Sequence, residues 1–417
     1  MLTLLPFTGL SIAAYLLWAL VAAWMVSLVL TIYGLSRQSS LLPFNDSALQ
    51  SDKALVSIIV PARNEEDRVL ADSIRSILAQ DYRPFEVIAI DDRSTDKTLS
   101  ILKSLAEADR RLRVIEGGDL PDGWLGKPNA MHQALNHARG DWILATDADM
   151  IFEKAALRTA LAAAQAENAD AISLIPFFET ASFWERVIIQ TWAWITLMFT
   201  IAYRINNPKT SGALGIGGFF LMRRTALARV GGYEALKNEV VEDVRLAEMI
   251  KRSGGRMLTV PAPHLLRTRM YRNFGEIWES CTRTWFSGMK FSFPFALVCA
   301  CSMYVLAVAP PLLAVISAIG IGSRIDGLWQ LFIPATFAWG TQIVVLMMSG
   351  FRSGVSVIYA FTAPLGLAML YTMLLDSSIR IQTRKGVTWK GRLIYDGAGV
   401  RPPDIGIFGS HNSSTQE

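Results

Sequence analysis

Long apolar runs lie near both ends of the chain and enclose a more polar body. Residues 9–35 contain no charged side chain, and similar runs cover 295–321, 328–348 and 355–375. A helix of about 20 apolar residues can cross a hydrocarbon core of roughly 30 Å. The pattern predicts four parts: an N-terminal transmembrane anchor at 1–36, a folded body at 53–292, C-terminal transmembrane helices at 293–376, and a basic juxtamembrane segment with a polar tail at 377–417.

Within the body, short strand-like runs alternate with helical ones. The expected strands are 55–60, 85–90, 112–115 and 142–146, and the expected helices are 65–79, 97–108 and 127–138. Strands that are separated by helices tend to pair in parallel, because each helix carries the chain back along the sheet. The predicted fold class is therefore α/β, with a mostly parallel sheet.

One further apolar stretch, at 187–203, is nearly long enough to span a membrane but lies inside the body. A crossing there would separate the acidic residues that precede it from Glu242 and Asp243, which follow it. Two interpretations stay open for 183–203: an aromatic helix that lies in the membrane interface, or a buried core helix.

The charges behind the last apolar run conflict with a simple count of crossings. Three crossings after a cytosolic body would place the basic residues of 380–392 outside, against the tendency of Lys and Arg to stay in the cytosol. One span is therefore expected to be miscounted. Our candidate is 295–321, because Pro310 and Pro311 would allow a kinked or re-entrant helix there.

Composition supports a membrane protein that does not bind nucleic acid. Hydrophobic residues fill 52% of the 417 positions and charged residues 18%. The net charge of +4 is small and dispersed, whereas nucleic-acid binding usually concentrates Lys and Arg on one face. The 3 cysteines form no even-numbered disulfide framework, which favours a reduced body facing the cytosol.

Acidic residues end two of the predicted strands. Asp91 and Asp92 close the second strand, and Asp147 and Asp149 close the fourth. In open α/β sheets ligands bind at the carboxyl ends of strands, and acidic clusters there suit a divalent metal that carries phosphates beside a polar nucleoside. Because Asp147 and Asp149 flank one residue, both side chains would point the same way from an extended strand end. These observations indicate a nucleotide-sugar site.

The acidic residues belong to an ordered series of motifs that resembles a family 2 glycosyltransferase with the GT-A fold, a Rossmann-like mixed sheet. The series comprises Ile59-Val60-Pro61-Ala62-Arg63-Asn64-Glu65-Glu66, residues 91–96, Gly126-Lys127, Asp147-Ala148-Asp149, Glu242-Asp243 and Arg283-Thr284-Trp285. Further strings at 123–127, 182–186 and 389–392 make the chain most similar to membrane-bound hopanoid-associated glycosyltransferases. Ceramide and carotenoid glycosyltransferases are the near relatives.

The resemblance implies a donor site and a metal. The residues that it assigns to the nucleotide sugar are Pro61, Ala62, Arg63, Glu65, Asp91, Asp92, Lys127, Asp147 and Arg283. Within that set, Asp92 would bind the base, Asp147 would lie near the ribose, and Lys127 would lie by the phosphates. Asp149 would hold Mg²⁺ or Mn²⁺, a hard cation that neutralises the leaving diphosphate.

Local structure offers another explanation for several of these residues. Asn64 could cap a helix whose first turn holds Glu65, and Asp91 and Asp92 could be turn residues. Lys127 could be a solvated residue at a helix start. A cation is disfavoured there by the helix dipole, however, and a bound anion would explain it.

Glu242 and Asp243 stand in a helix-like stretch, where an acidic first turn is favoured in any case. The resemblance makes the pair catalytic, with Asp243 as the general base that removes the proton of an accepting hydroxyl. One displacement inverts the anomeric centre, so an α-linked donor would give a β-linked product.

Gly217, Gly218 and Trp285 are the candidates for the acceptor side. The glycines indicate either a flexible loop or a close approach of the backbone to substrate. Arg283 and Trp285 depart from the family's Gln-x-x-Arg-Trp pattern, because Thr284 separates them. Arg283 could still reach the diphosphate and Trp285 the acceptor. The 4 histidines show no metal-ligand spacing.

The sequence thus predicts an integral protein of the cell inner membrane with a cytosolic catalytic domain. Its expected activity is inverting transfer of a sugar from a nucleotide donor, with UDP as the family default, to a membrane lipid such as a hopanoid. A processive polysaccharide synthase is one alternative, although it would be expected to keep Gln-x-x-Arg-Trp and to have more spans. A non-catalytic membrane scaffold is another, although it would be expected to have lost Asp149 or Asp243.

Overall fold

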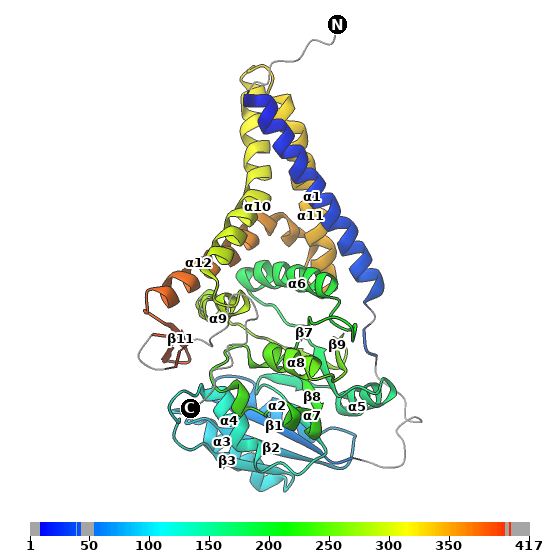
Figure 1. Cartoon of the computed structure of the whole chain (residues 1–417), viewed down its shortest axis with the longest axis vertical. Coiled ribbons are helices and arrows are strands. Elements are labelled where there is room, and N and C mark those ends of the chain that lie inside the picture. The colour runs from blue at the N-terminus through cyan, green and yellow to red at the C-terminus, as the bar shows by residue number, and fades with distance from the viewer. Residues whose placement is uncertain (1–8, 39, 43–53, 397–399, 402–417) are drawn as a thin grey trace, which may run out of the picture.

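A computed structural model of the chain describes residues 9–38, 40–42, 54–396 and 400–401. Most of the predicted polar tail, and residues 43–53 just before the body, lie outside these residues. Figure 1 shows a group of long helices at one end of the molecule and a sheet flanked by helices at the other.

The central sheet of the body is mixed and rich in parallel pairs. Its strands are β1 (Val56–Ala62), β2 (Phe85–Asp91), β3 (Leu112–Glu116), β4 (Trp142–Ala145), β6 (Ala171–Ile175), β8 (Phe220–Arg223) and β9 (Met257–Pro261), in the order β3-β2-β1-β4-β8-β6-β9. Only β8 runs antiparallel to its neighbours. Every residue of β2 is buried, as expected for a strand covered on both faces. The α/β prediction is confirmed.

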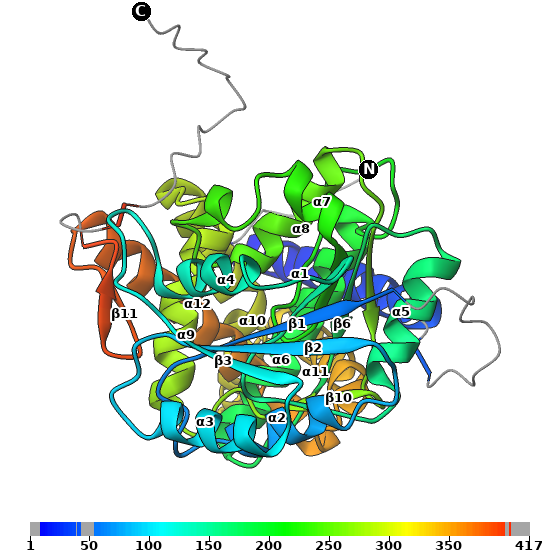
Figure 2. The same ribbon diagram turned by 90° about the horizontal axis from the view of Figure 1, so that it is seen from below.

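Helices cover both faces of this sheet, as Figure 2 shows. One face carries α2 (Leu70–Leu78) and α3 (Thr98–Ala108), and the other carries α4 (Gly126–Leu135), α7 (Arg224–Arg229) and α8 (Glu242–Arg252). The helix α5 (Ala156–Ala166) lies near β6, and a small second sheet joins β5 (Met150–Phe152), β10 (Leu266–Thr268) and β7 (Phe177–Phe178). Because β1 to β4 all run in the same direction, their carboxyl ends lie at the same edge of the sheet.

The helix expected at 65–79 begins at Leu70, because the preceding turn has other hydrogen bonds to make. Asn64 has a left-handed backbone, with φ of 50°, and its side-chain oxygen accepts the N–H of Thr95. The N–H of Glu65 donates to Thr98 Oγ1 at 2.7 Å. The turn after β1 is thus tied to the turn after β2, and the interpretation of Asn64 as a helix cap was wrong.

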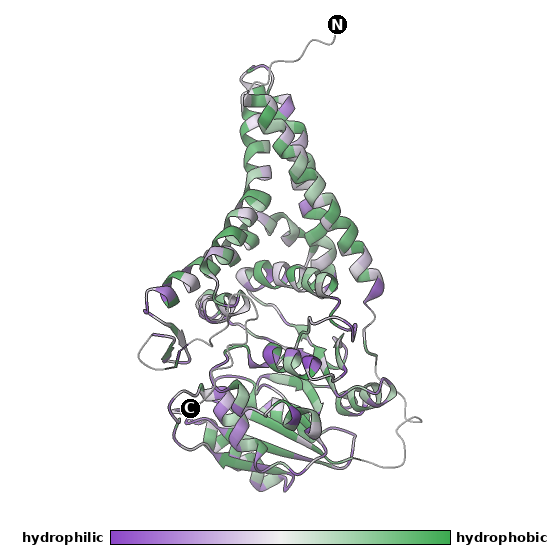
Figure 3. Ribbon diagram, viewed as in Figure 1, coloured by the Kyte–Doolittle hydropathy of each residue, from purple (hydrophilic) through white to green (hydrophobic). Residues whose placement is uncertain are grey.

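Four segments of the described chain are helical, long and apolar enough to cross a membrane: 9–37, 293–322, 329–352 and 357–382. They correspond to α1 (Gly9–Arg37), α10 (Phe293–Gly322), α11 (Trp329–Arg352) and a short turn of 3₁₀-helix, η2 (Val357–Thr362), followed by α12 (Ala363–Gln382). Their residues are largely hydrophobic, as the colours of the ribbon in Figure 3 show, and Leu16 and Ile319 are 65% and 66% exposed. Such surfaces are favoured in lipid, not in water.

The segment behind α12 lies beside the body. It forms a hairpin of β11 (Val387–Trp389) and β12 (Arg392–Ile394), and Arg392 contacts Asp92 of the body at 3.1 Å. If these helices cross a membrane, the contact places the body and the hairpin on the same side, which requires an even number of crossings between them. The helix α10 continues unbroken through its two prolines, and in Figure 1 it stands tall beside α1 and α11, whereas α12 stays close to the body. The arrangement favours α12, not residues 295–321, as the miscounted span.

The aromatic stretch at 187–203 forms α6 (Phe183–Tyr203), which runs crosswise between the tall helices and the body in Figure 1. It begins at a capping box between Ser182 and Glu185. Val187 and Trp194 are buried, and the ring of Trp194 lies 5.6 Å from that of Trp24 in α1. The helix is not among the four candidate spans, and it packs like a core helix while lying at the base of the apolar helices.

Candidate active site

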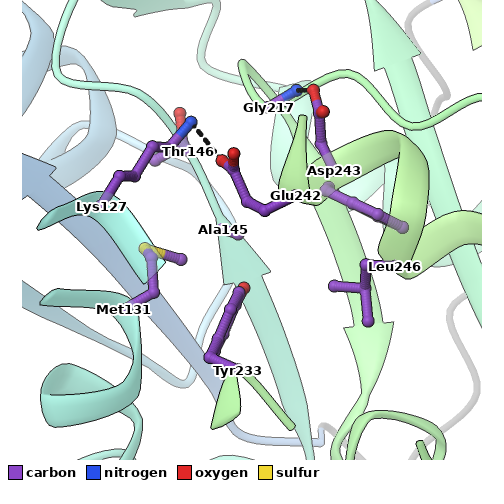
Figure 4. A pocket seen from close by; sticks show the side chains of 10 residues that line it. Lys127, Met131, Ala145, Thr146, Gly217, Tyr233, Glu242, Asp243 and Leu246 are labelled. Atoms are coloured by element: carbon purple, nitrogen blue, oxygen red, sulfur yellow. Dashed lines mark hydrogen bonds and ion pairs between the residues drawn. The ribbon is translucent and has the colours of Figure 1, made fainter. Parts of the chain in front are cut away.

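The predicted site residues gather at the carboxyl edge of the sheet. Lys127 lies in the first turn of α4, and Glu242 and Asp243 open α8. Together with Thr146 and Gly217 they line a small pocket, shown in Figure 4. Four segments that are far apart in sequence thus bring charged groups into one pocket.

Lys127 is the cation at the centre of this pocket. Its Nζ lies 2.8 Å from Asp147 and 2.7 Å from Glu242. Burial alone would lower the pKa of Lys127, but Asp147, Glu242 and Asp243 together raise it well above its ordinary value. The two contacting carboxylates offset the cost of a cation at a helix N-terminus, so Lys127 stays charged and is not a solvated residue.

Asp243 is held by two backbone N–H groups. Gly217 donates to Oδ2 at 2.7 Å and Val244 donates to Oδ1 at 2.8 Å. Burial, followed by the neighbouring Glu242, raises the pKa of the Asp243 carboxyl to about 7, although Lys127 opposes the rise. A carboxylate with a pKa near 7 suits general-base chemistry at neutral pH.

Asp149 does not extend a strand. Because β4 ends at Ala145, Asp147 to Asp149 form a turn before β5, and the premise that both side chains leave an extended strand end in one direction was wrong. Asp147 contacts Lys127, whereas Glu65, Arg68 and Lys390 are the other charges that act on Asp149. The two acidic residues therefore have different partners.

The surroundings of Asp149 fit a divalent metal that arrives with phosphates. Burial, then the carboxylates of Asp147 and Glu65, raise the pKa of Asp149 to about 7, which reports excess negative charge in the free site. Among the described residues no group of three or more His, Cys, Asp or Glu could hold a metal by itself. Mg²⁺ is commonly held by one or two carboxylates plus substrate phosphates, so the donor set fits.

The turns after β1 and β2 form the other end of the site, next to Pro61 and Ala62 at the end of β1. Arg63 donates to the backbone carbonyls of Asp92 at 2.6 Å and Arg93 at 2.8 Å, and so holds the second turn in place. The carboxylate of Asp92 contacts Arg93 and Arg392. In contrast, Asp91 Oδ1 is buried and has no hydrogen-bond partner within the described chain, which leaves an acceptor for a ligand.

Gly217 and Gly218 lack room for a side chain for different reasons. A Cβ on Gly217 would lie 3.0 Å from Lys127 Nζ and 3.4 Å from Asp243 Oδ2, so this backbone closely approaches the charged groups of the pocket. A Cβ on Gly218 would instead meet Met150 Sδ at 2.8 Å, which is a packing constraint. The acceptor assignment of Gly218 and of Trp285, whose ring lies 6.2 Å from Tyr371 in α12, stays a prediction.

Arg283 lies on α9 (Phe274–Gly288) and is largely, although not fully, buried. Its guanidinium stacks on the ring of Trp389 at 5.0 Å, and its Nε has no hydrogen-bond partner among the residues described. Burial lowers the pKa of Arg283, while Tyr271, Glu242 and other acidic neighbours raise it. A buried cation of this kind is suited to an anionic ligand.

Two cations of this region were not predicted as site residues. Lys390 contacts Glu65, and Arg392 contacts Asp92. Their string at 389–392 was noted as part of the resemblance, but it stands about 300 residues away along the chain, so no sequence pattern placed it at the nucleotide end. Tyr233, whose buried hydroxyl lines the pocket in Figure 4, was also missed.

Comparison with known proteins shows the fold and a similarity to one family over part of the body. The model of the family "Glycosyl transferase family 2" matches residues 57–231. A 4,4'-diaponeurosporenoate glycosyltransferase of Staphylococcus aureus is 27% identical over 235 residues, which are 54% of this chain and 60% of that relative. The chain thus matches less than two thirds of the relative's length.

Among solved structures, the mannosyltransferase PcManGT from Pyrobaculum calidifontis, in complex with GDP-Man and Mn²⁺, has a similar fold. It superposes with a TM-score of 0.51 at 17% sequence identity, covering 88% of this chain and 98% of that one. At this identity the likeness concerns the fold, and it confirms the GT-A architecture. The family model thus covers residues 57–231 of the body, and in this part the chain is similar to glycosyl transferase family 2.

Proposed function

We propose that the protein transfers a sugar from a nucleotide-sugar donor to a membrane lipid, with inversion at the anomeric carbon. The observation that carries the proposal is the juxtaposition of Asp243 with Lys127 in one pocket at the sheet edge, with a carboxylate pKa near 7 beside a permanent cation. The first group can accept a proton and the second can hold a phosphate. Apolar helices stand directly above that body (Figure 3).

In the proposed reaction, an acceptor hydroxyl attacks the anomeric carbon while the bond from that carbon to the diphosphate breaks. Asp243 takes the hydroxyl proton, and the nucleoside diphosphate leaves with the bonding electron pair. Lys127 and Arg283 stabilise the negative charge on the diphosphate. Asp149 would hold Mg²⁺ or Mn²⁺, whose charge neutralises phosphate oxygens.

The nucleotide end of the site consists of Pro61, Ala62, Arg63, Glu65 and the two turn aspartates. The resemblance favours Asp92 as the contact to the base, and Asp91 Oδ1 offers a second acceptor that is already unpartnered. The PcManGT structure contains GDP-Man, whereas UDP is the default of the family. A panel of donors therefore belongs in the first experiment.

A lipid acceptor follows from the position of the site beneath the apolar helices. The S. aureus relative is named for an acceptor with a long apolar carotenoid chain, which is consistent with this position. Hopanoid-type lipids head our list, followed by carotenoids, sphingolipids and polyprenyl phosphates. We further propose that the body faces the cytosol at the inner membrane, because the basic residues behind α12 lie with it.

The test uses full-length protein in lipid nanodiscs, a panel of nucleotide sugars, Mg²⁺ or Mn²⁺, and candidate lipids supplied one at a time. We expect metal-dependent formation of a monoglycosylated lipid. A polymer product would replace the proposal with a processive synthase. No turnover of any donor, even with lipids extracted from the host, would favour the scaffold.

The rate of transfer should depend on pH through Asp243. Because its pKa is raised to about 7, the carboxylate form that accepts a proton is complete only above this pH. We expect kcat/KM for a hydroxyl acceptor to fall about tenfold per pH unit below 7. A rate that is flat between pH 5.5 and 8 would contradict the general-base role. Donor binding measured over the same range serves as the control.

Gly217→Ala should impair catalysis without unfolding the protein. The added methyl would lie 3.0 Å from Lys127 Nζ and 3.4 Å from Asp243 Oδ2, so these side chains must shift by tenths of an ångström. We expect kcat to fall roughly tenfold or more, because small displacements of reacting groups are costly. Gly123→Ala is a control in which the methyl meets nothing within 4 Å, although its φ of 78° adds local strain. Unchanged kcat in Gly217→Ala would contradict the close-approach interpretation.

A further inference from the structure

The hairpin behind α12 is fastened across the nucleotide end of the site. Lys390 Nζ donates to the backbone carbonyl of Arg63 at 2.6 Å and also contacts the carboxylate of Glu65. Arg392 contacts Asp92 at 3.1 Å. These are the residues of the turns after β1 and β2, so the hairpin bridges both turns. We call residues 387–394 the strap.

The strap reaches further than these two turns. A Cβ on Gly126 would lie 2.5 Å from Arg392 Nη1, so this guanidinium ends next to the residue that precedes Lys127. At the other side, Lys390 is among the charges that act on Asp149. Arg392 therefore lies at the base end of the site, and Lys390 is near enough to Asp149, the residue proposed to hold the metal, to act on its charge. A diphosphate would run between these two ends.

The turn of the strap is built at some conformational cost to place Lys390. Lys390 and Gly391 both have positive φ, 44° and 77°, the pattern of a two-residue hairpin turn of type I′. Such turns favour Asn followed by Gly, and a lysine in the left-handed region is unusual. Asn would fit the backbone of this turn better than Lys does. The turn geometry therefore does not explain the lysine, whereas its charged ammonium group can.

The strap is held firmly from the membrane side. Trp389 lies under the guanidinium of Arg283, and the N–H of Lys390 donates to Glu279 Oε1 at 3.1 Å. Immediately after the strap, Tyr395 is 1% exposed and donates to the carbonyl of Asn238 at 2.8 Å. Only four residues separate the end of α12 from the strap. The strap therefore joins the apolar helices to the nucleotide end of the site.

We propose that the strap is part of the donor site, with Lys390 and Arg392 as positioning residues for the nucleoside diphosphate. In the free protein the two cations pair with Glu65 and Asp92. When the donor binds, its phosphates provide the negative charge that these cations meet. This inference rests on the proposed function, since it assumes that the bound molecule is a nucleotide sugar.

Lys390→Asn tests the role of the charge without changing the fold of the strap. Asn suits the first position of a type I′ turn, so the strap should keep its shape while the ammonium is lost. We expect the Kd of the nucleoside diphosphate, and the KM of the donor, to rise tenfold or more, because hydrogen bonds to charged groups are among the stronger ones. The KM of the lipid acceptor should be unchanged, and Lys390→Arg should restore part of the affinity. Lys385→Asn, on an exposed residue between α12 and the strap, is the matched control.

The experiment measures binding of UDP, GDP, ADP and CDP with Mg²⁺ or Mn²⁺ to full-length protein in nanodiscs. Thermal unfolding of each variant confirms that Lys390→Asn still folds. If wild-type protein binds one of these nucleotides and Lys390→Asn and Arg392→Gln bind it equally well, the strap proposal fails alone. Tighter binding by the variants would show that the strap obstructs the site and would also overturn it. If wild-type protein binds none of the nucleotides, the proposed function fails and the strap proposal fails with it.

Discussion

Asp243→Asn is expected to lower transfer to a hydroxyl-bearing lipid by about 10²- to 10⁴-fold, the usual contribution of a positioned general base. The amide keeps the shape of the carboxylate and can still accept one of the N–H groups of Gly217 and Val244. It cannot accept a proton. Donor binding should therefore persist while kcat falls, which single-turnover measurements with saturating donor would show.

Glu242→Gln is the matched comparison, because it changes the neighbouring carboxylate in the same helix turn. Glu242 contacts Lys127 at 2.7 Å and raises the pKa of Asp243. Its loss should lower that pKa, so the pH profile should shift to lower pH while much of the rate remains at pH 8. A loss in Glu242→Gln larger than that in Asp243→Asn would reverse the two assigned roles.

The same variant also distinguishes classes of acceptor. A lipid hydroxyl has a proton to lose, whereas a carboxylate or phosphate acceptor is already ionised at neutral pH. With an ionised acceptor, Asp243→Asn should change the rate much less, because no general base is needed. Comparing a hopanoid alcohol with a carotenoid carboxylic acid in this variant therefore tests the acceptor and the mechanism together.

The sheet and its acidic edge could be predicted because their signals are local. The run 85–90 is apolar except for Glu86 and forms the buried strand β2, and Asp91 and Asp92 stand at its end. The start of α2 could not be predicted in this way. Glu65, the first residue of the expected helix, donates its N–H to Thr98, and the preceding Asn64 accepts from Thr95. Helical propensity contains no information about partners that lie 30 residues or more away.

The strap shows the same limit more strongly. Lys390 and Glu65 are in contact although 325 residues separate them. Neither periodicity nor charge pattern couples such distant positions, so the basic residues behind α12 predicted membrane orientation alone. Their second property, proximity to the nucleotide turns, exists only once α9 and α12 have packed together, with Trp278 Nε1 donating to Asp376 at 2.8 Å.

Asp149→Asn is expected to lower the rate of metal-dependent transfer at least about 10²-fold. It is also expected to raise the stability of the metal-free protein. The loss follows because an amide is a weaker ligand for a hard cation than a carboxylate is. The gain follows from the raised pKa of Asp149. The folded protein binds this proton more tightly than the unfolded chain, so the contribution of Asp149 to stability is greatest at low pH and falls as pH rises from about 4 to about 7.

Thermal unfolding in nanodiscs with a chelator checks the second effect. At pH 8 the wild-type carboxylate is charged among Asp147 and Glu65, and Asn should raise Tm by a few degrees. At pH 5 the wild-type group is protonated, so the difference should vanish. Asp326→Asn, on an exposed residue between α10 and α11, should change neither Tm nor transfer. Transfer within a few fold of wild type in Asp149→Asn would move the metal to another residue. Lost transfer without a gain in Tm would instead mean that crowded negative charge does not limit the stability of the free site.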